Sequence, residues 1–429
     1  MEQKKDPNTR NIVLTMLVET LEKQGFSHIL IQDVFSGQEL EGQERAFATR
    51  LYYGTLEQLL YLDYVIDHYS KTPVKKMKPV VRDILRMSLY QMLFMDGVPD
   101  HAAIHEGVEL AGKRGFRNLK GFVNGILRTI QREGVPEDIP ENIRYGVPEW
   151  IYELVMEQEG HENAVRFFTS INRSDPPVTA RVNLKNHTRE EIGRMLEEDQ
   201  CRFTFHEEIP EAVILEDFPD LTSLRAYKEG LLFFQDISAM YPAILLAEAA
   251  GNDPVKKILD VCAAPGGKSL HLAEKFPDAA ILSRDLTEDK VRLIEENKER
   301  IGADNVTCEV FDACIPDERL FGQMDIVVAD LPCSGLGVIG NKPDIRYRVQ
   351  KEDLKELQTL QRKILQTVQA YVAEGGLLSY STCTINNGEN EENARWFAGT
   401  FSFEPVTEKR FLPGLCDCDG AYVAIFRRK

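Results

Sequence analysis

The chain has 429 residues, of which 43% are hydrophobic, 28% charged and 9% aromatic. This composition is typical of a folded soluble protein and argues against disordered, collagen-like and membrane-spanning classes. The formal net charge of −18 would by itself argue against a polyanionic partner. At roughly 150 residues per domain we expect two or three cores. Residues 1–7 are charged and lead into an amphipathic segment, unlike a secretion signal, so we expect a cytoplasmic protein with no membrane partner.

The charge is distributed unevenly along the chain. Residues 1–135 hold 18 basic and 17 acidic residues, which leaves a net charge of −19 for the remainder. The bases of this first part form two clusters, namely Lys71, Lys75, Lys76, Lys78, Arg82 and Arg86, and then Lys113, Arg114, Arg117, Lys120, Arg128 and Arg132. Such a density could follow a phosphate backbone, but two solvated helix faces would explain it equally well.

The first part is predicted to be helical throughout. From residue 11 to residue 132, apolar residues recur at helical spacing, as at Ile12, Val13, Met16 and Leu17. Glycines and prolines divide the stretch into five to seven helices, which favours an all-α bundle. Residues 133–140 are rich in proline, glycine and acid and indicate a linker. The first domain is therefore predicted to span residues 1–138.

Two further domains are predicted from the order of the elements. Residues 145–240 contain helix candidates at 150–168 and 188–197 and short strand candidates at 178–183, 201–206 and 212–215, which predicts a small α+β module of the ferredoxin-like kind. From residue 241 to residue 429, seven strand candidates alternate with amphipathic helices in the manner of a doubly wound, Rossmann-like sheet. These candidates lie at 257–261, 279–283, 306–311, 325–329, 376–381, 401–404 and 421–426, the last two forming an antiparallel edge.

The strand at 257–261 runs into a turn of small residues that opens a helix. The turn is Cys262, Ala263, Ala264, Pro265, Gly266, Gly267 and Lys268. In this arrangement backbone N–H groups and the helix N-terminus face whatever binds above the sheet. Gly267-Lys268-Ser269 imitates a P-loop, but that motif requires glycine at position 262, which is cysteine, and no G-x-G-x-x-G is present. A site that cradles phosphates is therefore disfavoured.

Three aspartates follow the next three strands, which indicates the kind of ligand. Asp285, Asp312 and Asp330 each lie at or just past a strand end. A carboxylate after the second strand can accept both ribose hydroxyls, and one after the third can meet an adenine amino group. Any one of them could be an ordinary cap, but three in register favour an adenosyl ligand that lacks phosphates. S-adenosylmethionine fits this pattern better than NAD.

Two of the eight cysteines are placed for covalent chemistry. Cys333, in Asp330-Leu331-Pro332-Cys333-Ser334-Gly335, follows the fourth strand, and Cys383 follows the fifth. Addition of a thiolate to C6 of a pyrimidine makes C5 nucleophilic, so that C5 can accept a sulfonium methyl group. A second group must then assist removal of the C5 proton and loss of the thiol, and an acid near N3, for which Asp330 is placed, would stabilise the intermediate. The cysteines lack C-x-x-C pairs, which favours reduced thiols over disulfides or a metal site.

Taken together, these motifs resemble the NOL1/NOP2/Sun family of RNA 5-methylcytosine methyltransferases over nearly the whole chain. Further matching segments are Asn172-Arg173-Ser174-Asp175-Pro176-Pro177, Arg181-Val182-Asn183, Gln235-Asp236-Ile237-Ser238 and Lys342-Pro343-Asp344-Ile345-Arg346. The resemblance implies that residues 241–429 form an S-adenosylmethionine-dependent methyltransferase domain, that Cys383 attacks C6 and that Cys333 helps to release the product. It also implies a substrate in small-subunit ribosomal RNA, at cytosine 967.

The helical first domain resembles the RNA-binding bundle of the antitermination factor NusB. That resemblance supports RNA contacts through the basic clusters, and the contacts expected are Lys75, Lys76, Arg82, Lys113, Arg114, Arg117 and, from the second domain, Arg181. Two departures from the family pattern are visible, since Thr384 follows the nucleophile where serine is usual and Arg284 precedes the ribose acid where an apolar residue is commoner. Neither removes a functional group from the mechanism.

Other interpretations stay open at this point. The chain could methylate transfer RNA or another ribosomal RNA site, or it could be a non-catalytic RNA-binding assembly factor, although a pure binder has no reason to keep both Cys333 and Cys383. It could also be a DNA cytosine methyltransferase, in which the cysteine of a Pro-Cys pair is the nucleophile and the base is likewise flipped out. The absence of heptad repeats makes a monomer the default expectation.

Overall fold

The computed structural model describes residues 9–23, 25–37, 40, 42–173, 177–218 and 221–429. They fall into two compact units, the first made of Met1–Ala164 with Ile339–Val349 and the second of Val165–Val338 with Gln350–Lys429. The segment Ile339–Val349, which lies in the third of the domains predicted from the sequence, packs with the first. None of the described helices is long and apolar enough to cross a membrane.

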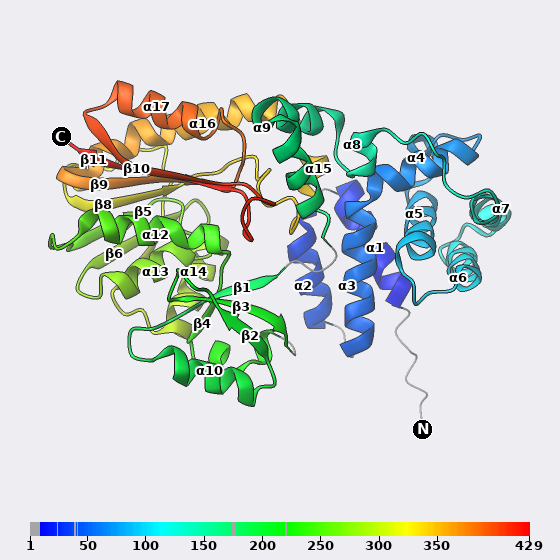
Figure 1. Cartoon of the computed structure of the whole chain (residues 1–429), viewed down its shortest axis with the longest axis horizontal. Coiled ribbons are helices and arrows are strands. Elements are labelled where there is room, and N and C mark those ends of the chain that lie inside the picture. Colours follow the sequence, from blue (N-terminus) through cyan, green and yellow to red (C-terminus); the bar gives the residue numbers. More distant parts are fainter. Residues whose placement is uncertain (1–8, 24, 38–39, 41, 174–176, 219–220) are drawn as a thin grey trace. The chain divides into compact units, whose positions relative to one another are not determined.

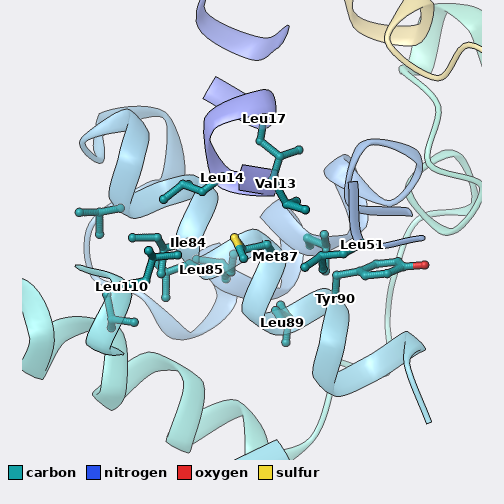
Figure 2. Close-up of a cluster of buried hydrophobic side chains, with 14 of the residues drawn as sticks. Val13, Leu14, Leu17, Leu51, Ile84, Leu85, Met87, Leu89, Tyr90 and Leu110 are labelled. Carbon is teal, nitrogen blue, oxygen red and sulfur yellow. The ribbon is translucent and has the colours of Figure 1, made fainter. Parts of the chain in front are cut away.

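The first unit is helical, as predicted, and its core lies among the helices of residues 9–133 (Figure 1). Those helices are α1 Thr9–Lys23, α2 Ser27–Gly37, α3 Gly42–Glu57, α4 Leu59–Tyr69, α5 Pro79–Phe94, α6 Asp100–Lys113 and α7 Lys120–Glu133. Figure 2 shows how Val13 and Leu17 of α1, Leu51 of α3 and Leu85 of α5 gather in one cluster, in which each is essentially fully buried. The apolar spacing in the sequence therefore marks the inward faces of these helices.

A segment from the far end of the chain completes this unit. Its short helix α15, Ile345–Arg348, follows Asp344, which accepts a hydrogen bond from the Ser27 hydroxyl. The guanidinium of Arg346 is fully buried and donates to the carbonyl oxygens of Glu57, at 3.2 Å, and Gly146, at 3.3 Å. Gly146 has a φ of +64°, and a Cβ atom there would lie 2.3 Å from the Glu57 carbonyl oxygen. The Lys342–Arg346 motif is thus explained by packing within the helical unit.

A small antiparallel sheet begins the second unit. Its strands are β1 Val178–Val182, β2 Arg202–Phe205, β3 Ala212–Asp217 and β4 Leu232–Phe234, in the order β2-β3-β1-β4. The predicted helix between the first two strands is α10, Arg189–Glu198, which begins at a capping box formed by Thr188 and Glu191. Strand β4 was not predicted, because three residues are too few for an alternating pattern to show.

The large sheet has the predicted seven strands. They are β5 Lys257–Asp260, β6 Ala280–Asp285, β7 Val306–Val310, β8 Met324–Asp330, β9 Val372–Thr382, β10 Phe403–Phe411 and β11 Ala421–Arg428. The order is β10-β11-β9-β8-β5-β6-β7, and β11 runs antiparallel to both β9 and β10. Strand β10 extends well beyond the predicted 401–404. The prediction missed its second half because the charged residues at 404 and 408–410, which are common on edge strands, obscure the alternating apolar pattern.

Alternate residues of the central strands enter two different cores. Ile258 packs on one face and Leu259 on the other, and Val328 and Val327 of β8 divide in the same way. Helices α12 Ile237–Ala250, α13 Gly267–Lys275 and α14 Glu288–Ile301 cover the first face, whereas α16 Asp353–Val368 and α17 Glu391–Thr400 cover the second (Figure 1). Both faces of the sheet are buried, so its polar chemistry is confined to the strand ends.

Candidate active site

Acidic residues and cysteines lie at the carboxyl ends of four neighbouring strands. Asp285, Asp260 and Asp330 are the last residues of β6, β5 and β8, and β9 ends directly before Cys383. After β5 the chain adds β6 and β7 on one side of β5 and then returns to place β8 on its other side. The strand order therefore reverses between β5 and β8. Ligands of open α/β sheets bind outside the carboxyl ends of the strands at such a point.

The backbone of the small-residue turn after β5 is hydrogen-bonded to the end of β6. Gly266, with a φ of +106°, is the residue before α13, and the backbone N–H of Ala264 donates to the Asp285 carboxylate at 3.0 Å. A Cβ atom on Gly267 would lie 3.2 Å from the Phe233 ring, so small residues are needed here. Burial raises the pKa of the Cys262 thiol, which keeps this cysteine neutral.

Two of the three predicted acids hold neighbouring backbone as well. The Asp285 carboxylate is 4% exposed, accepts the Leu286 N–H at 2.7 Å and pairs with Lys290 at 3.0 Å. Asp312 accepts the N–H of Cys314 at 2.8 Å. Because the Lys290 side chain is largely exposed, it can leave Asp285 when a better donor arrives.

A fourth aspartate, Asp260, was not named as a site residue from the sequence. It is fully buried, and its Oδ2 accepts the Ser269 hydroxyl at 2.7 Å, whereas its Oδ1 has no hydrogen-bond partner in the described part of the chain. Burial, with a smaller contribution from Asp330, raises the pKa of Asp260 to about 7. A buried oxygen without a donor is costly, so this atom is available to a ligand's hydrogen-bond donor or cation.

Lys268 joins the turn to the end of β8. Its ammonium lies 2.6 Å from Oδ2 of Asp330, whose Oδ1 accepts the Ser381 hydroxyl at 2.7 Å. Burial alone would lower the pKa of Lys268, but the Asp330 carboxylate, Asp260 and Cys383 together raise it above its ordinary value. Lys268 is therefore a fixed positive charge close to Cys383.

The two predicted cysteines are side by side. Their sulfur atoms are 3.3 Å apart, and the backbone N–H of Cys383 also donates to the sulfur of Cys333 at 3.3 Å. Cys383 is exposed and Cys333 is half-buried. The hydrogen bond to Cys383, burial and the charges of Cys383 and Glu389 raise the pKa of Cys333 well above its ordinary value. Cys333 thus keeps its proton beside the exposed Cys383.

The candidate RNA contacts divide into exposed and structural residues. Lys75, Lys76, Lys113 and Arg117 are exposed. Arg82 pairs with Glu22, and Arg114 donates to the carbonyl oxygen of Asn11 at 3.1 Å, so both of these side chains also tie helices together. The first cluster is not a uniform surface, because its member Arg86 is buried between Asp63, at 2.6 Å, and Asp83, at 2.8 Å.

The expectation that Arg181 contacts RNA is not supported by its position. Its side chain is 1% exposed, pairs with Glu274 and donates to Gln235 at 3.2 Å. Arg284, the departure from the family pattern, is also internal, since its guanidinium pairs with Glu309 and Asp317, each at 2.7 Å. In the described residues no group of three or more His, Cys, Asp or Glu side chains is arranged to hold a metal ion.

Three family models match the chain in succession. Residues 7–132 match the NusB family, residues 147–222 match the ferredoxin-like domain of RsmF/B-like methyltransferases, and residues 244–400 match the model described as 16S rRNA methyltransferase RsmB/F. These matches confirm the predicted fold classes of the helical bundle, the small module and the Rossmann-like domain.

Curated relatives match over nearly the full length. A protein of Bacillus subtilis named probable ribosomal RNA small subunit methyltransferase B is 35% identical, with 99% of this chain and 100% of the relative covered. Proteins named ribosomal RNA small subunit methyltransferase B are 32% identical in Vibrio cholerae, with 91% of each chain covered, and 31% identical in Escherichia coli O1:K1, with 99% and 100% covered.

Solved structures support the fold. The crystal structure titled PH0851 has a TM-score of 0.85 at 24% identity and covers 100% of both chains. A methyltransferase homolog from Pyrococcus horikoshii has a TM-score of 0.58 at 24% identity, with 67% of this chain and 97% of that chain covered.

Proposed function

The chain belongs to the family of 16S rRNA methyltransferases RsmB/F, and on that premise we propose that it methylates C5 of one cytosine in small-subunit ribosomal RNA. S-adenosylmethionine is the proposed methyl donor, and the proposed intermediate joins Cys383 to C6 of the base. The observation that carries this proposal is the pair of sulfur atoms 3.3 Å apart at the strand ends that border the cofactor turn.

The residues around the turn suit S-adenosylmethionine. Asp285 is proposed to accept the ribose hydroxyls in place of Lys290, and Asp312 to meet the adenine amino group. The unpartnered Oδ1 of Asp260 suits a cationic amino group, and the turn from Cys262 to Lys268 is proposed to line the ligand. When bound, S-adenosylmethionine supplies an electrophilic methyl group on a sulfonium.

The two thiols and their neighbours suit the steps on the base. We assign the attack on C6 to the Cys383 thiolate, which the positive charge of Lys268 stabilises. C5 then takes the methyl group, and the C5 proton passes to water, because the Cys333 thiol is itself protonated. The electron pair of the C5–H bond re-forms the double bond between C5 and C6, and the bond between C6 and sulfur breaks, which returns Cys383 as a thiolate. Cys333, whose pKa is raised by its bond to Cys383 and by burial, is assigned to this release. Asp330 is proposed to face N3 of the base.

Incubation of the pure protein with labelled S-adenosylmethionine and either ribosomal RNA, transfer RNA or duplex DNA tests the reaction and its substrate. We expect label in 5-methylcytosine of small-subunit ribosomal RNA, at cytosine 967 when the site is mapped by bisulfite sequencing. Label in transfer RNA or DNA instead would establish one of the alternative enzymes, and no label in any of the three would favour an assembly factor.

Replacement of Asp285 by alanine is expected to weaken binding of S-adenosylmethionine by about 2–3 kcal/mol, or roughly 30- to 150-fold, because buried hydroxyl groups lose a charged acceptor. Isothermal titration calorimetry measures the change in dissociation constant. The matched control is Asp289→Ala, which replaces an exposed aspartate in the first turn of α14, the helix that follows β6. An unchanged dissociation constant for Asp285→Ala would show that this carboxylate does not touch the ligand.

RNA binding by the helical unit is expected to depend on its exposed bases. The double variant Lys113→Glu with Arg117→Glu should weaken RNA affinity and reduce the salt slope of binding by about 2, or about 1 per lost phosphate contact. Fluorescence anisotropy at several salt concentrations measures both quantities. The control, Lys185→Glu with Lys256→Glu, makes the same charge change on exposed residues of the second unit. Equal losses in the two variants would mean that the basic clusters are only solvated helix faces.

A further inference from the structure

A fully buried carboxylate lies behind the two cysteines. Glu389, in the segment between Cys383 and α17, is 0% exposed. Its Oε1 accepts the Ser334 hydroxyl at 2.6 Å and the Asn386 side-chain amide at 3.1 Å. Its Oε2 accepts the backbone N–H of Ser334 at 2.9 Å and the Gln361 side-chain amide at 2.9 Å. Four donors therefore surround this carboxylate, two on each oxygen, and its buried charge is compensated by hydrogen bonds.

The donors come from both cysteine loops. Ser334 follows Cys333, and its hydroxyl lies 2.7 Å from the hydroxyl of Thr384, which follows Cys383. Because the single hydroxyl proton of Ser334 goes to Glu389, Thr384 is the donor in this second bond. A chain of hydrogen bonds thus runs from Glu389 through Ser334 to Thr384. It also shows what Thr384 does in place of the usual serine, since only the hydroxyl is used.

The carboxylate is itself held from a third side. Gln361 of α16, which is fully buried, donates from its amide nitrogen to the carbonyl oxygen of Pro332 at 2.9 Å as well as to Glu389. The Tyr380 hydroxyl of β9 donates to the backbone carbonyl of Glu389. Pro332 directly precedes Cys333, so α16 fixes the same loop that Glu389 binds.

From these contacts we infer that Glu389 is a positioning residue: its carboxylate sets the Cys333 loop against the Cys383 loop and so fixes the distance between the two sulfur atoms. The inference rests on the proposed function, in which the two thiols act on one base. A buried hydrogen-bonded group that spans two loops is suited to this role, since small displacements of reacting groups have large effects on rate.

The charge of Glu389 has a second effect on the same pair. It adds to the bond with Cys383 and to burial in raising the pKa of Cys333. Removal of the charge should therefore lower the pKa of Cys333, which a residue that only fills space would not do. The geometry and the charge can be separated by comparing a neutral isostere with a shorter acid.

The test is Glu389→Gln in the full chain. The amide keeps the shape but turns an NH2 group toward donors, so we expect kcat for RNA methylation to fall by about 100-fold. The KM for RNA and the dissociation constant for S-adenosylmethionine should stay within about twofold, since Glu389 touches neither ligand in the proposed mechanism. The matched control is Glu392→Gln, on an exposed residue three positions away, for which no loss is expected.

Glu389→Asp keeps the negative charge but shortens the side chain by one methylene, so its carboxylate no longer reaches the same donors. We therefore expect the kcat of Glu389→Asp to stay below that of the wild type, as in Glu389→Gln. The alkylation rate of Cys333 against pH, followed by peptide mass spectrometry, should give a lower apparent pKa in Glu389→Gln than in the wild type. If Glu389→Gln does not fold, Thr384→Val against Thr384→Ser tests the same chain of bonds, and only the valine variant should lose activity.

The inference is overturned if the wild type methylates RNA and Glu389→Gln does so at an unchanged kcat, or if Glu389→Asp has full activity. Equal activity of Thr384→Val and Thr384→Ser would overturn it as well. A wild-type protein that transfers no methyl group to any RNA would instead contradict the proposed function, so the two failures are distinguishable.

Discussion

Replacement of Cys383 by alanine is expected to reduce methyl transfer to below detection and to prevent any covalent protein–RNA adduct. Cys383 is exposed at the end of β9, whereas its neighbour Cys333 keeps its proton, and the charge of Lys268 is close enough to favour the thiolate of Cys383. Without that sulfur nothing in the proposed mechanism adds to C6, and C5 stays a poor nucleophile. Transfer of label from S-adenosylmethionine and denaturing electrophoresis with labelled RNA measure the two losses.

Cys308→Ala is the matched control for this variant. Cys308 lies on β7 of the same sheet and is assigned no part in the chemistry, so its loss should leave both readouts unchanged. Binding of S-adenosylmethionine should be close to wild type in both variants. A Cys383→Ala protein that still transfers methyl groups would show that the attack comes from another residue.

The candidate site was predictable from the sequence as far as it depends on strand ends. Asp285, Asp330, Cys333 and Cys383 each follow a buried apolar run, and parallel strands bring their carboxyl ends to one edge. The structure places the two sulfur atoms 3.3 Å apart, in the loops that follow the paired strands β8 and β9. The turn at 262–268 was likewise visible, because a run of small residues joins a predicted strand to a predicted helix.

The sequence did not reveal the orientation of several side chains or the groups that they contact. Asp260 is one residue before the end of the predicted strand, and its position alone does not show that one oxygen is left without a donor. Glu389 lies in a polar stretch, Asn386 to Glu392, that is indistinguishable from a solvated loop. Arg181 was expected to contact RNA, but its spacing in the sequence does not show that its side chain is 1% exposed and pairs with the half-buried Glu274.

Long-range packing explains the remaining difference. Residues 339–349 lie between two strands of the large sheet, and nothing in their spacing indicates that Arg346 belongs to the helical unit. The carbonyl oxygen of Glu57, which accepts a hydrogen bond from Arg346, lies 289 positions earlier in the sequence. The periodicity of apolar residues predicts which face of an element is buried, but it does not identify the element packed against that face.

Replacement of Cys333 by alanine is expected to have a different result, namely a protein–RNA adduct that survives denaturing electrophoresis. Cys333 is assigned to release because it stays protonated beside the nucleophile, so its loss leaves attack and methyl transfer possible. Elimination of Cys383 from the methylated base then becomes the slow step, and the adduct accumulates instead of free product. The amount of shifted protein after incubation with S-adenosylmethionine and RNA measures this effect, with the wild type as the reference.

The same gel separates the two possible nucleophiles. In a DNA cytosine methyltransferase the thiol of the Pro-Cys pair attacks, so Cys333→Ala would abolish the adduct. The Cys383 variant would trap the adduct only if Cys383 helped release. A double variant, Cys333→Ala with Cys383→Ala, should give no adduct under either assignment and controls for binding that is not covalent. An adduct with Cys383→Ala and none with Cys333→Ala would show that Cys333 attacks C6 and that Cys383 assists release. Glu389 holds Ser334, the residue after the half-buried Cys333, whereas Cys383 is exposed. The geometry therefore favours attack by the exposed sulfur of Cys383 and release assisted by Cys333.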